Sequence, residues 1–274
     1  MWARDKIRPF PGSVFDFSLP LMLTLEEYEK LNPHCELTHN GIKVVFATPT
    51  TFTKWRVDSL FQKEPITIQW IAELAAGEVL VDIGANVGMY SIWAAKTRGA
   101  RVFAFEPEAQ NYAILNRNIV LNGLDSQITA YCVALSDAGG YSELHLSDLR
   151  PGGSCHSLGE RVDFKHEPMI PKYSQGCVAA RLDDLVAAGV IPTPHYVKID
   201  VDGIEPKIIA GARGVLANRA LRSLLIETNQ NLADHRRMVE ELQSLGFRYD
   251  PTQVAAAERR DGAFKGVAEY VFRR

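Results

Sequence analysis

The fold of this chain is decided by residues 79–88, VLVDIGANVG, which read as an apolar strand, a tight glycine turn and the start of a helix. Gly84 and Gly88 allow the backbone to approach a ligand closely, and Asn86 is the non-glycine residue type that best tolerates a positive φ. In open α/β sheets, ligands bind beyond the carboxyl ends of the strands. Residues 79–88 therefore predict a ligand site across this turn.

The same alternation of strands and helices continues beyond the turn. Apolar, β-rich runs are found at 79–83, 101–106, 128–135, 196–201 and 221–228. Helical patterns are found at 65–77, 87–97, 108–122, 182–188, 204–217 and 233–245. We expect an α/β fold with a mostly parallel sheet, right-handed crossovers and helices on both faces. An antiparallel edge pair, residues 247–249 and 268–272, is expected to complete the sheet.

Two segments fall outside this alternation. Residues 1–60 are predicted to form an N-terminal extension, in which Asn40-Gly41 indicates a β-hairpin because a type I′ turn needs two positive φ angles. The main domain is then expected over 61–274. Within it, residues 138–176 contain paired glycines, prolines and histidines and predict an insertion loop. The extension and the loop are the expected sources of an acceptor pocket or lid.

The composition is that of a globular protein with a small-molecule partner. The 274 residues include 30 basic and 33 acidic ones, and the resulting net charge of −3 disfavours nucleic acid and anionic lipid as partners. The four cysteines are scattered without zinc-binding spacing and are expected to be reduced thiols. No secretory signal or membrane span is predicted, so we expect a cytoplasmic protein. The sequence does not predict the oligomeric state.

Two carboxylates at strand ends that we expect to be exposed indicate a nucleoside ligand. Glu106, at the end of the second strand, can accept both hydroxyls of a ribose. Asp82 lies at the mouth of the glycine turn, where it would repel a pyrophosphate but suit an ammonium or sulfonium group. A dinucleotide fingerprint would need glycine at 86 and glycine or alanine at 89, where this chain has Asn86 and Met89. These features favour S-adenosylmethionine over NAD.

Several short motifs together are far more specific than the glycine turn alone. They are VDIGANVG at 81–88, AFEP at 104–107, Asn118, Asn122, LD at 182–183 and KIDVDGIE at 198–205. With them, the sequence from about Pro65 to Phe247 resembles the class I S-adenosylmethionine-dependent methyltransferases of the FkbM family, which usually have Glu where this chain has Asp202. The resemblance implies a seven-stranded Rossmann-like sheet and methylation of a hydroxyl on a sugar, a glycolipid or a secondary metabolite.

The resemblance also implies how the donor is held. The turn at 82–88 would hold its methionine half, Glu106 its ribose, and residues 134–135 its adenine. The candidate residues for binding S-adenosylmethionine are Asp82, Gly84, Ala85, Asn86, Gly88, Glu106, Pro107, Ala134, Leu135 and Asp200. The expected acceptor is a small molecule or a glycan.

Asp200 is the predicted group that assists the reacting hydroxyl. Alternate residues of the strand 196–201 share one face, which places Asp200 at its carboxyl end and Lys198 one pleat below. A carboxylate there could take the proton of an alcohol, which is a poor nucleophile at neutral pH. Lys198 is expected to pair with neighbouring carboxylates, and His235 is the alternative base.

Other interpretations of these residues remain open. Asp200, Asp202, Glu205 and Glu227 offer the oxygen ligands that Mg²⁺ prefers, but no metal is expected to be required. Asp202 and Glu205 alternatively complement the dipole of the helix that follows them. An NAD(P)-dependent oxidoreductase and a non-catalytic nucleoside-binding or scaffold protein are the alternatives to a methyltransferase.

Overall fold

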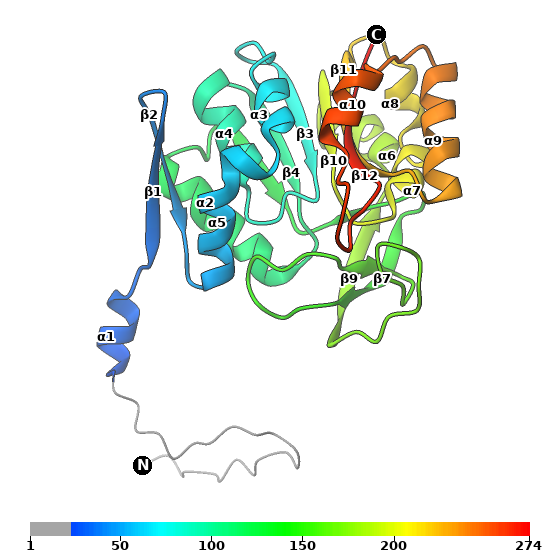
Figure 1. The fold of residues 1–274 in the computed structure, drawn as a ribbon. Helices are drawn as coiled ribbons and strands as arrows, with labels where there is room; N and C mark the ends of the chain where they lie inside the picture. The colour runs from blue at the N-terminus through cyan, green and yellow to red at the C-terminus, as the bar shows by residue number, and fades with distance from the viewer. Residues whose placement is uncertain (1–22) are drawn as a thin grey trace. The chain divides into compact units, whose positions relative to one another are not determined.

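A central sheet of six strands is present in residues 23–274, the part of the chain described by the structure, a computed structural model. The strand order is β12-β11-β10-β3-β4-β5, and every pair is parallel except β11 and β12. The strands are β3 (Val79–Ile83), β4 (Arg101–Phe105), β5 (Ile128–Tyr131), β10 (Tyr196–Ile199), β11 (Ser223–Asn229) and β12 (Val267–Arg273). The predicted Rossmann-like α/β fold with an antiparallel C-terminal edge strand is confirmed (Figure 1).

The seventh strand implied by the resemblance is not found among the described residues. Residues 247–249 form no strand, and this segment is tied to β12 by a single bridge between Arg248 and Arg273. The helix α10 (Pro251–Ala257) begins directly afterwards, with Asp250 as its N-cap. Residues 247–249 were expected to pair with β12. Instead, β11 is the antiparallel partner of β12 and pairs with it along its whole length.

Helices cover both faces of the sheet, as the alternation predicts. One face carries α2 (Thr51–Lys63), α3 (Pro65–Ile71), α4 (Met89–Arg98) and α5 (Ala109–Asn122). The other carries α6 (Leu182–Ala187), α7 (Glu205–Ala210), α8 (Arg213–Ala217), α9 (Ala233–Ser244) and α10. Leu80 packs with the first group, whereas Val81 and Ile83 pack with the second, as expected for the two faces of one strand.

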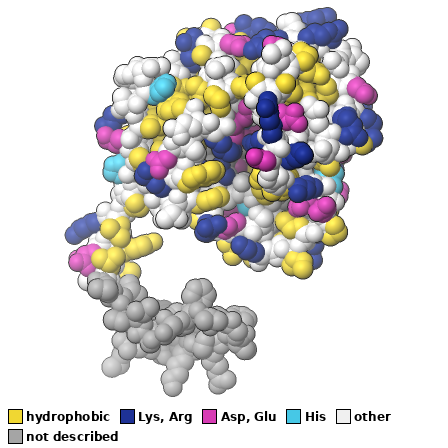
Figure 2. Space-filling view, in the orientation of Figure 1, with side chains coloured by type: hydrophobic (Ala, Val, Ile, Leu, Met, Phe, Trp, Pro, Cys, Tyr) yellow, Lys and Arg dark blue, Asp and Glu magenta, His cyan; other side chains and the backbone are white. Residues whose placement is uncertain are grey.

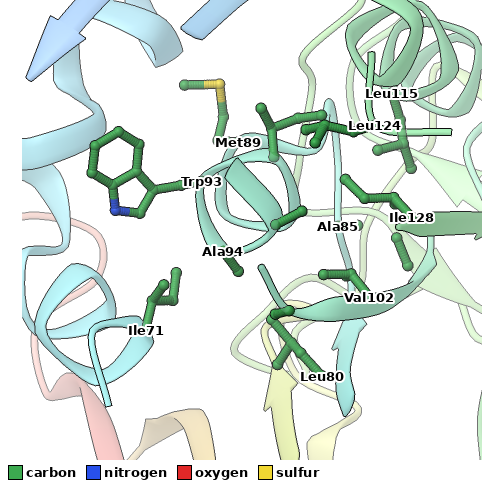
Figure 3. Packing of buried hydrophobic residues seen from close by; sticks show 14 of the residues in the cluster. Ile71, Leu80, Ala85, Met89, Trp93, Ala94, Val102, Leu115, Leu124 and Ile128 are labelled. Carbon is green, nitrogen blue, oxygen red and sulfur yellow. The ribbon is translucent and has the colours of Figure 1, made fainter. Parts of the chain in front are cut away.

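The packing on the first face fixes the helix that follows the glycine turn. Figure 3 shows Ala94 of α4 and Leu115 of α5 in one apolar cluster with Leu80 and Val102 of the sheet. These four side chains are fully buried. Burying a valine or leucine side chain contributes about 1.5–3 kcal/mol. The middle of α4 is thereby held against β3, β4 and α5.

The two glycines of the turn are required by packing of the protein on itself. Both have a positive φ, 78° at Gly84 and 83° at Gly88. A Cβ at Gly84 would overlap the carbonyl oxygen of Asp200, and a Cβ at Gly88 would overlap Cδ1 of Leu115. Gly84 therefore lets β3 approach β10, and Gly88 lets α4 approach α5.

A β-hairpin packs against α5. It consists of β1 (His34–His39) and β2 (Ile42–Ala47), and its turn has the predicted positive φ at Asn40 (50°) and Gly41 (76°). Asn118 Oδ1 accepts the Ala47 N–H at 2.7 Å, and Asn122 bonds both backbone groups of Val45. The hairpin thus belongs to the compact unit 33–274, and the boundary expected at 60 is wrong because the chain divides at 32.

The segment 138–176 is not an irregular loop throughout. It contributes to a separate four-stranded sheet, in the order β6-β9-β7-β8. The strands are β6 (Ala134–Leu135), β7 (Gly140–Leu146), β8 (Ser157–Leu158) and β9 (Tyr173–Ala180). The predicted strand 128–135 is accordingly divided, because its last two residues leave the central sheet to pair with β9. This small sheet lies beside the central one in Figure 1.

The N-terminal unit, residues 1–32, includes one described helix, α1 (Leu25–Lys30). Thr24 caps it by accepting the Glu27 N–H, while Glu27 accepts the Thr24 N–H in return. The remainder of the predicted extension before residue 23 lies outside the described residues. No helix described within 23–274 is long and apolar enough to cross a membrane.

Candidate active site

A cavity of about 580 Å³ lies at the carboxyl ends of the central strands. Its wall is formed by the ends of β3, β4, β10 and β11, by α2 and the small sheet, and by residues from 147–156 and 259–264. Cavities of about 300–1,000 Å³ bury most of a small organic ligand. The site predicted from the glycine turn therefore coincides with a cavity of suitable size.

Glu106 is held at one end of this cavity by the backbone. Its Oε2 accepts the Asn86 N–H at 2.7 Å, and its Oε1 accepts the Glu108 N–H at 2.9 Å. The residue is only 5% exposed, so the expected exposure at the strand end is wrong. Burial raises the pKa of Glu106 to about 7, although the two N–H groups oppose this rise. Pro107, Ala134 and Leu135 line the cavity near this carboxylate.

The loop after β7 is tied to the glycine turn. Asn86, with φ 50°, donates from Nδ2 to the Gly153 carbonyl at 2.7 Å. Asn111 of α5 donates to the same carbonyl at 3.1 Å and accepts the Gly152 N–H at 2.7 Å. Asn111 lines the cavity but was not predicted, since a single Asn inside a helical pattern carries no signal of its contacts. These bonds fix one wall of the cavity.

Lys198 holds two carboxylates at the other end. Its Nζ lies 3.0 Å from Asp200 Oδ2 and 3.9 Å from Asp82 Oδ1, which confirms the predicted pairing. Asp82 is 1% exposed, accepts a hydrogen bond from Ser91 at 2.6 Å and does not line the cavity. Its expected position at an exposed strand end is therefore wrong, because the pairing of β3 with β10 sets it against Lys198.

The same ion pair sets the protonation of these groups. Burial raises the pKa of Asp82, and the Lys198 charge opposes the rise. For Asp200, burial acts in the same direction, but Lys198 and Lys63 outweigh it and lower the pKa to about 2. Asp200 lines the cavity with 24% of its side chain exposed. It is therefore a fixed anion at neutral pH.

Two more carboxylates line this end. Asp202, with φ 61°, accepts the Cys155 N–H at 2.7 Å. Glu227 of β11 accepts a hydrogen bond from Arg259 Nη2 at 2.7 Å. Charges of both signs thus meet here, and on the face drawn in Figure 2 acidic and basic side chains are likewise interspersed.

Besides Asp82, three more of the predicted site residues lie outside the cavity. His235 is 1% exposed, accepts the Asn229 N–H at Nδ1 and places Nε2 3.3 Å from the Gly203 carbonyl. It is absent from the cavity wall, as are Ala85 and Gly88. Glu205 is buried under the turn after β10, where it accepts the Val201 and Gly203 N–H groups. His235 therefore contacts the backbone of the turn after β10 from outside the cavity.

The other candidates for donor binding do meet in one cavity. Its wall includes Gly84, Asn86, Glu106, Pro107, Ala134, Leu135 and Asp200. Within residues 23–274, no group of three or more His, Cys, Asp or Glu side chains has an arrangement that could hold a metal ion. The cavity combines apolar surface, one carboxylate held by the backbone and a cluster of charged groups.

Comparison with known proteins gives three similar methyltransferases. Hexuronic acid methyltransferase AglP of Haloferax volcanii is 24% identical over 177 residues, covering 65% of this chain and 67% of that protein. Methyltransferase sdnD of Sordaria araneosa is 36% identical over 163 residues, covering 52% and 62%. 31-O-demethyl-FK506 methyltransferase FkbM of Streptomyces tacrolimicus is 27% identical over 160 residues, covering 51% and 61%. The matched region therefore spans about two thirds of these relatives.

A protein-family model also matches this chain. The model described as the methyltransferase FkbM domain matches residues 82–249, which is more than half of the 274 residues. The match begins at Asp82 in β3, includes the cavity residues at the ends of β4, β10 and β11, and ends after α9. From this match and the fold, the chain belongs to the FkbM family of methyltransferases.

Proposed function

We propose that the protein transfers a methyl group from S-adenosylmethionine to a hydroxyl of a sugar, a glycolipid or a small metabolite. The observation that carries this proposal is a single cavity that joins the Glu106 end to the Asp200 and Glu227 end. One end suits a nucleoside, and the other supplies groups that can bind and deprotonate a hydroxyl. S-adenosylmethionine would supply a methyl group already activated by a positively charged sulfur.

The Glu106 end fits the nucleoside half of this donor. Each Glu106 oxygen accepts one backbone N–H, and a carboxylate oxygen has a second lone pair available. Both oxygens can therefore accept from the hydroxyls of a ribose. Ala134, Leu135 and Pro107 offer apolar surface to an adenine. The backbone bonds hold the carboxylate in position before the ligand binds, which reduces the cost of ordering it.

The charges at the other end favour a cationic donor over NAD. Asp200 and Asp202 both line the cavity, and the low pKa keeps Asp200 ionised. An anionic pyrophosphate would be repelled there, whereas a sulfonium would be attracted. Asn86 and Met89 also depart from the dinucleotide pattern. These features support a methyl donor over a nicotinamide cofactor.

The acceptor side is built by α2 and the loop after β7. Phe52 and Trp55 lie stacked with ring centroids 5.6 Å apart, and both line the cavity. Trp55 is 47% exposed, so its ring offers apolar area beside polar groups such as Ser147. A sugar ring has apolar faces and polar edges of the same kind. The names of two relatives, a hexuronic acid methyltransferase and a 31-O-demethyl-FK506 methyltransferase, support a hydroxyl of this class as acceptor.

A thermal-shift comparison tests the donor first. S-adenosylhomocysteine at 100 times its Kd should stabilise the protein by about 2.7 kcal/mol, while NAD should leave the melting temperature unchanged. The acceptor is then sought by transfer of labelled methyl from S-adenosylmethionine to methyl β-D-glucuronoside, other glycosides and hydroxylated macrolides. Stabilisation by NAD alone would favour an oxidoreductase. A response to neither ligand would favour a non-catalytic protein.

A further inference from the structure

We propose that Glu227, positioned by Arg259, accepts the proton of the acceptor hydroxyl during methyl transfer. This assignment rests on the proposed function and names a different base from the two that the sequence predicts. It follows from the contacts of each titratable group in the cavity wall.

Asp200 is poorly suited to take this proton. The buried Nζ of Lys198 lies 3.0 Å from its Oδ2, and Lys63 adds a second positive charge nearby. These charges lower its pKa to about 2, far below the operating pH at which a general base is efficient. Its fixed negative charge is better suited to attracting a cationic donor.

Histidine and cysteine in the cavity wall are also poorly placed to act as bases. His156 accepts the Ser147 N–H at Nδ1, so its proton lies on Nε2, and that nitrogen can only donate. Burial lowers the His156 pKa to about 4. Cys155 donates toward Asp202 at 3.6 Å, and burial raises the pKa of its thiol to about 12. Neither group is a free acceptor near neutral pH.

The other carboxylates of the wall already have partners. Both oxygens of Glu106 accept backbone N–H groups at the nucleoside end. Asp202 accepts the Cys155 N–H and thiol. Asp148 is bonded by the Arg150 guanidinium, which lowers its pKa despite the opposing effect of burial. At Glu106 and Asp202 these partners oppose the rise in pKa that burial causes, and at Asp148 the guanidinium outweighs burial. In all three, the partners engage oxygens that would otherwise be open to a hydroxyl proton.

Glu227 differs because one of its oxygens remains available. Within residues 23–274, Arg259 Nη2 donates to Oε1, and no hydrogen bond to Oε2 is found. The parallel register pairs Ile199 with Ile226, so Glu227 follows directly opposite Asp200 on the next strand. Both residues line the same cavity. A hydroxyl bound beside Asp200 would therefore lie close to Oε2 of Glu227.

The surroundings of Glu227 also suit a base. Burial, Asp200 and Asp202 raise its pKa well above the usual range for a carboxyl, while Arg259 opposes this rise. Glu269 lies directly across from it on β12, and Glu64 at the start of α3 is a further neighbouring carboxyl. Lys63 of α2 faces the same cluster. A carboxylate with a raised pKa gains more from taking a proton than Asp200 does.

The step balances as one concerted displacement. The hydroxyl proton passes to Oε2 of Glu227, and an electron pair of the acceptor oxygen forms the new bond to the methyl carbon. The bond between that carbon and the sulfonium breaks, and its electron pair remains on sulfur, which becomes a neutral thioether. Arg259 keeps the carboxylate oriented, and the proton later leaves to solvent.

The test compares Glu227→Gln with the wild type, using the acceptor found among the glycosides and macrolides. Gln keeps the shape but cannot take the proton, so kcat should fall about 10²- to 10⁴-fold. The Kd of S-adenosylhomocysteine should change less than about threefold. In the wild type at saturating S-adenosylmethionine, where the titration of Glu106 does not limit donor binding, kcat/KM for the acceptor should fall as the pH drops below the Glu227 pKa. This acidic limb should be absent in the variant.

Three further variants make the assignment specific. Asp200→Asn should retain the acidic limb but move it to lower pH, because the Asp200 charge raises the Glu227 pKa. Arg259→Gln should move that limb to higher pH, because Arg259 lowers the Glu227 pKa. Glu160→Gln makes the same chemical change at a side chain that is 63% exposed, and it controls for the substitution itself. Near-normal kcat in Glu227→Gln, or loss of the limb in Asp200→Asn alone, would overturn the proposal.

A measurement that needs no acceptor distinguishes a failure of the Glu227 assignment from a failure of the proposed function. In protein labelled with ¹³C at the glutamate carboxyls, several signals should titrate above the usual carboxyl range, because burial also raises the pKa of Glu106, Glu205 and Glu269. One signal of this group should disappear in Glu227→Gln. If every acceptor fails while this signal is present, the methyl transfer to hydroxyls is in question and the Glu227 assignment is not. If the signal is absent, or is unchanged in Glu227→Gln, Glu227 is not the base. Thermal melting of each variant shows whether it is folded.

Discussion

Glu106 and Glu227 lie at the same edge of the central sheet and line the same cavity, but they are held in different ways. Backbone N–H groups of Asn86 and Glu108 hold the first, whereas the second is held by the Arg259 side chain. A backbone donor is fixed by the path of the chain, while a side-chain ion pair depends on charge and rotamer. The geometry of the Glu106 end is thus fixed by the fold of the chain, whereas the geometry of the Glu227 end depends on one side-chain ion pair.

Gly84 lies between the two ends, so its replacement should disturb both. In Gly84→Ala, the new Cβ would overlap the Asp200 carbonyl at a φ that L residues rarely adopt. We expect a loss of more than about 4 kcal/mol in the free energy of unfolding, measured by urea denaturation. Gly77→Ala is the matched control, because φ is 79° and nothing lies within 4 Å of the added Cβ. It should cost only about 1–2 kcal/mol, and equal losses in both would contradict the packing explanation.

Asp82→Asn tests whether Asp82 stabilises the fold through Lys198 or binds the donor directly. The substitution removes the more distant of two carboxylates beside the buried Lys198, and Asp200 still pairs with Lys198 at 3.0 Å. The loss of stability should therefore be only part of the roughly 3–5 kcal/mol that an uncompensated buried charge costs. Thermal or urea unfolding should show this loss. The Kd of S-adenosylhomocysteine should change less than about threefold, because Asp82 does not line the cavity. A tenfold weaker Kd with unchanged stability would instead support the sequence-based assignment of Asp82 to the donor.

Glu106→Ala tests whether the Glu106 end of the cavity binds the donor. A hydrogen bond to a charged group contributes about 1.5–3 kcal/mol, so the Kd of S-adenosylhomocysteine should rise roughly ten- to 150-fold by calorimetry. Glu143→Ala, an exposed carboxylate of β7 outside the cavity, is the control. Unchanged affinity in Glu106→Ala would remove the donor site from this end.

The pH dependence of donor binding tests the role of Glu106 in a second way. Burial raises the Glu106 pKa to about 7, and a protonated carboxyl loses acceptor capacity toward the ribose. The Kd should therefore rise as the pH falls below about 7, by up to about tenfold per pH unit. This dependence should be missing in Glu106→Ala. A pH-independent Kd in the wild type would contradict the assignment.

Chelation should have the smallest effect. The described residues contain no arrangement of His, Cys, Asp or Glu that could hold a metal, and placement of the reacting groups can support the transfer. EDTA should therefore leave turnover within about twofold of its starting value. Abolition by EDTA with rescue by Mg²⁺ would instead make Asp200 and Glu227 metal ligands.

Local patterns in the sequence predict the parts of the fold that depend on neighbouring residues. β3, the glycine turn and α4 follow from the run 79–88, and the hairpin turn follows from Asn40-Gly41. The small sheet could not be found in this way, because β7 and β9 pair across 26 intervening residues, 147–172. α2 was missed because its apolar residues show weak periodicity, and α10 because its seven residues, PTQVAAA, are too short to show a helical period.

In the candidate site, too, contacts between distant segments could not be predicted from local patterns. Strand ends could be located, so Glu106 and Asp200 were found at the cavity. The burial of Asp82 could not be predicted, since it depends on the register of β3 with β10, which sets Asp82 opposite Lys198. Glu227 was recognised as a carboxylate near a strand end, but its partner Arg259 comes from a loop beyond α10. Pairings between distant segments decide which carboxylate is buried, paired or available.

Two of the asparagines of α5, Asn118 and Asn122, have a consequence for association with other chains. An outer strand usually presents unpaired N–H and C=O groups that can recruit a strand from another molecule. In β2, Asn122 occupies both backbone groups of Val45, and Asn118 occupies the N–H of Ala47. These side chains take the place of a neighbouring strand, and the helix covers that side of the hairpin. The sequence thus protects this edge against edge-to-edge aggregation without a charged or proline residue in β2 between Val44 and Ala47.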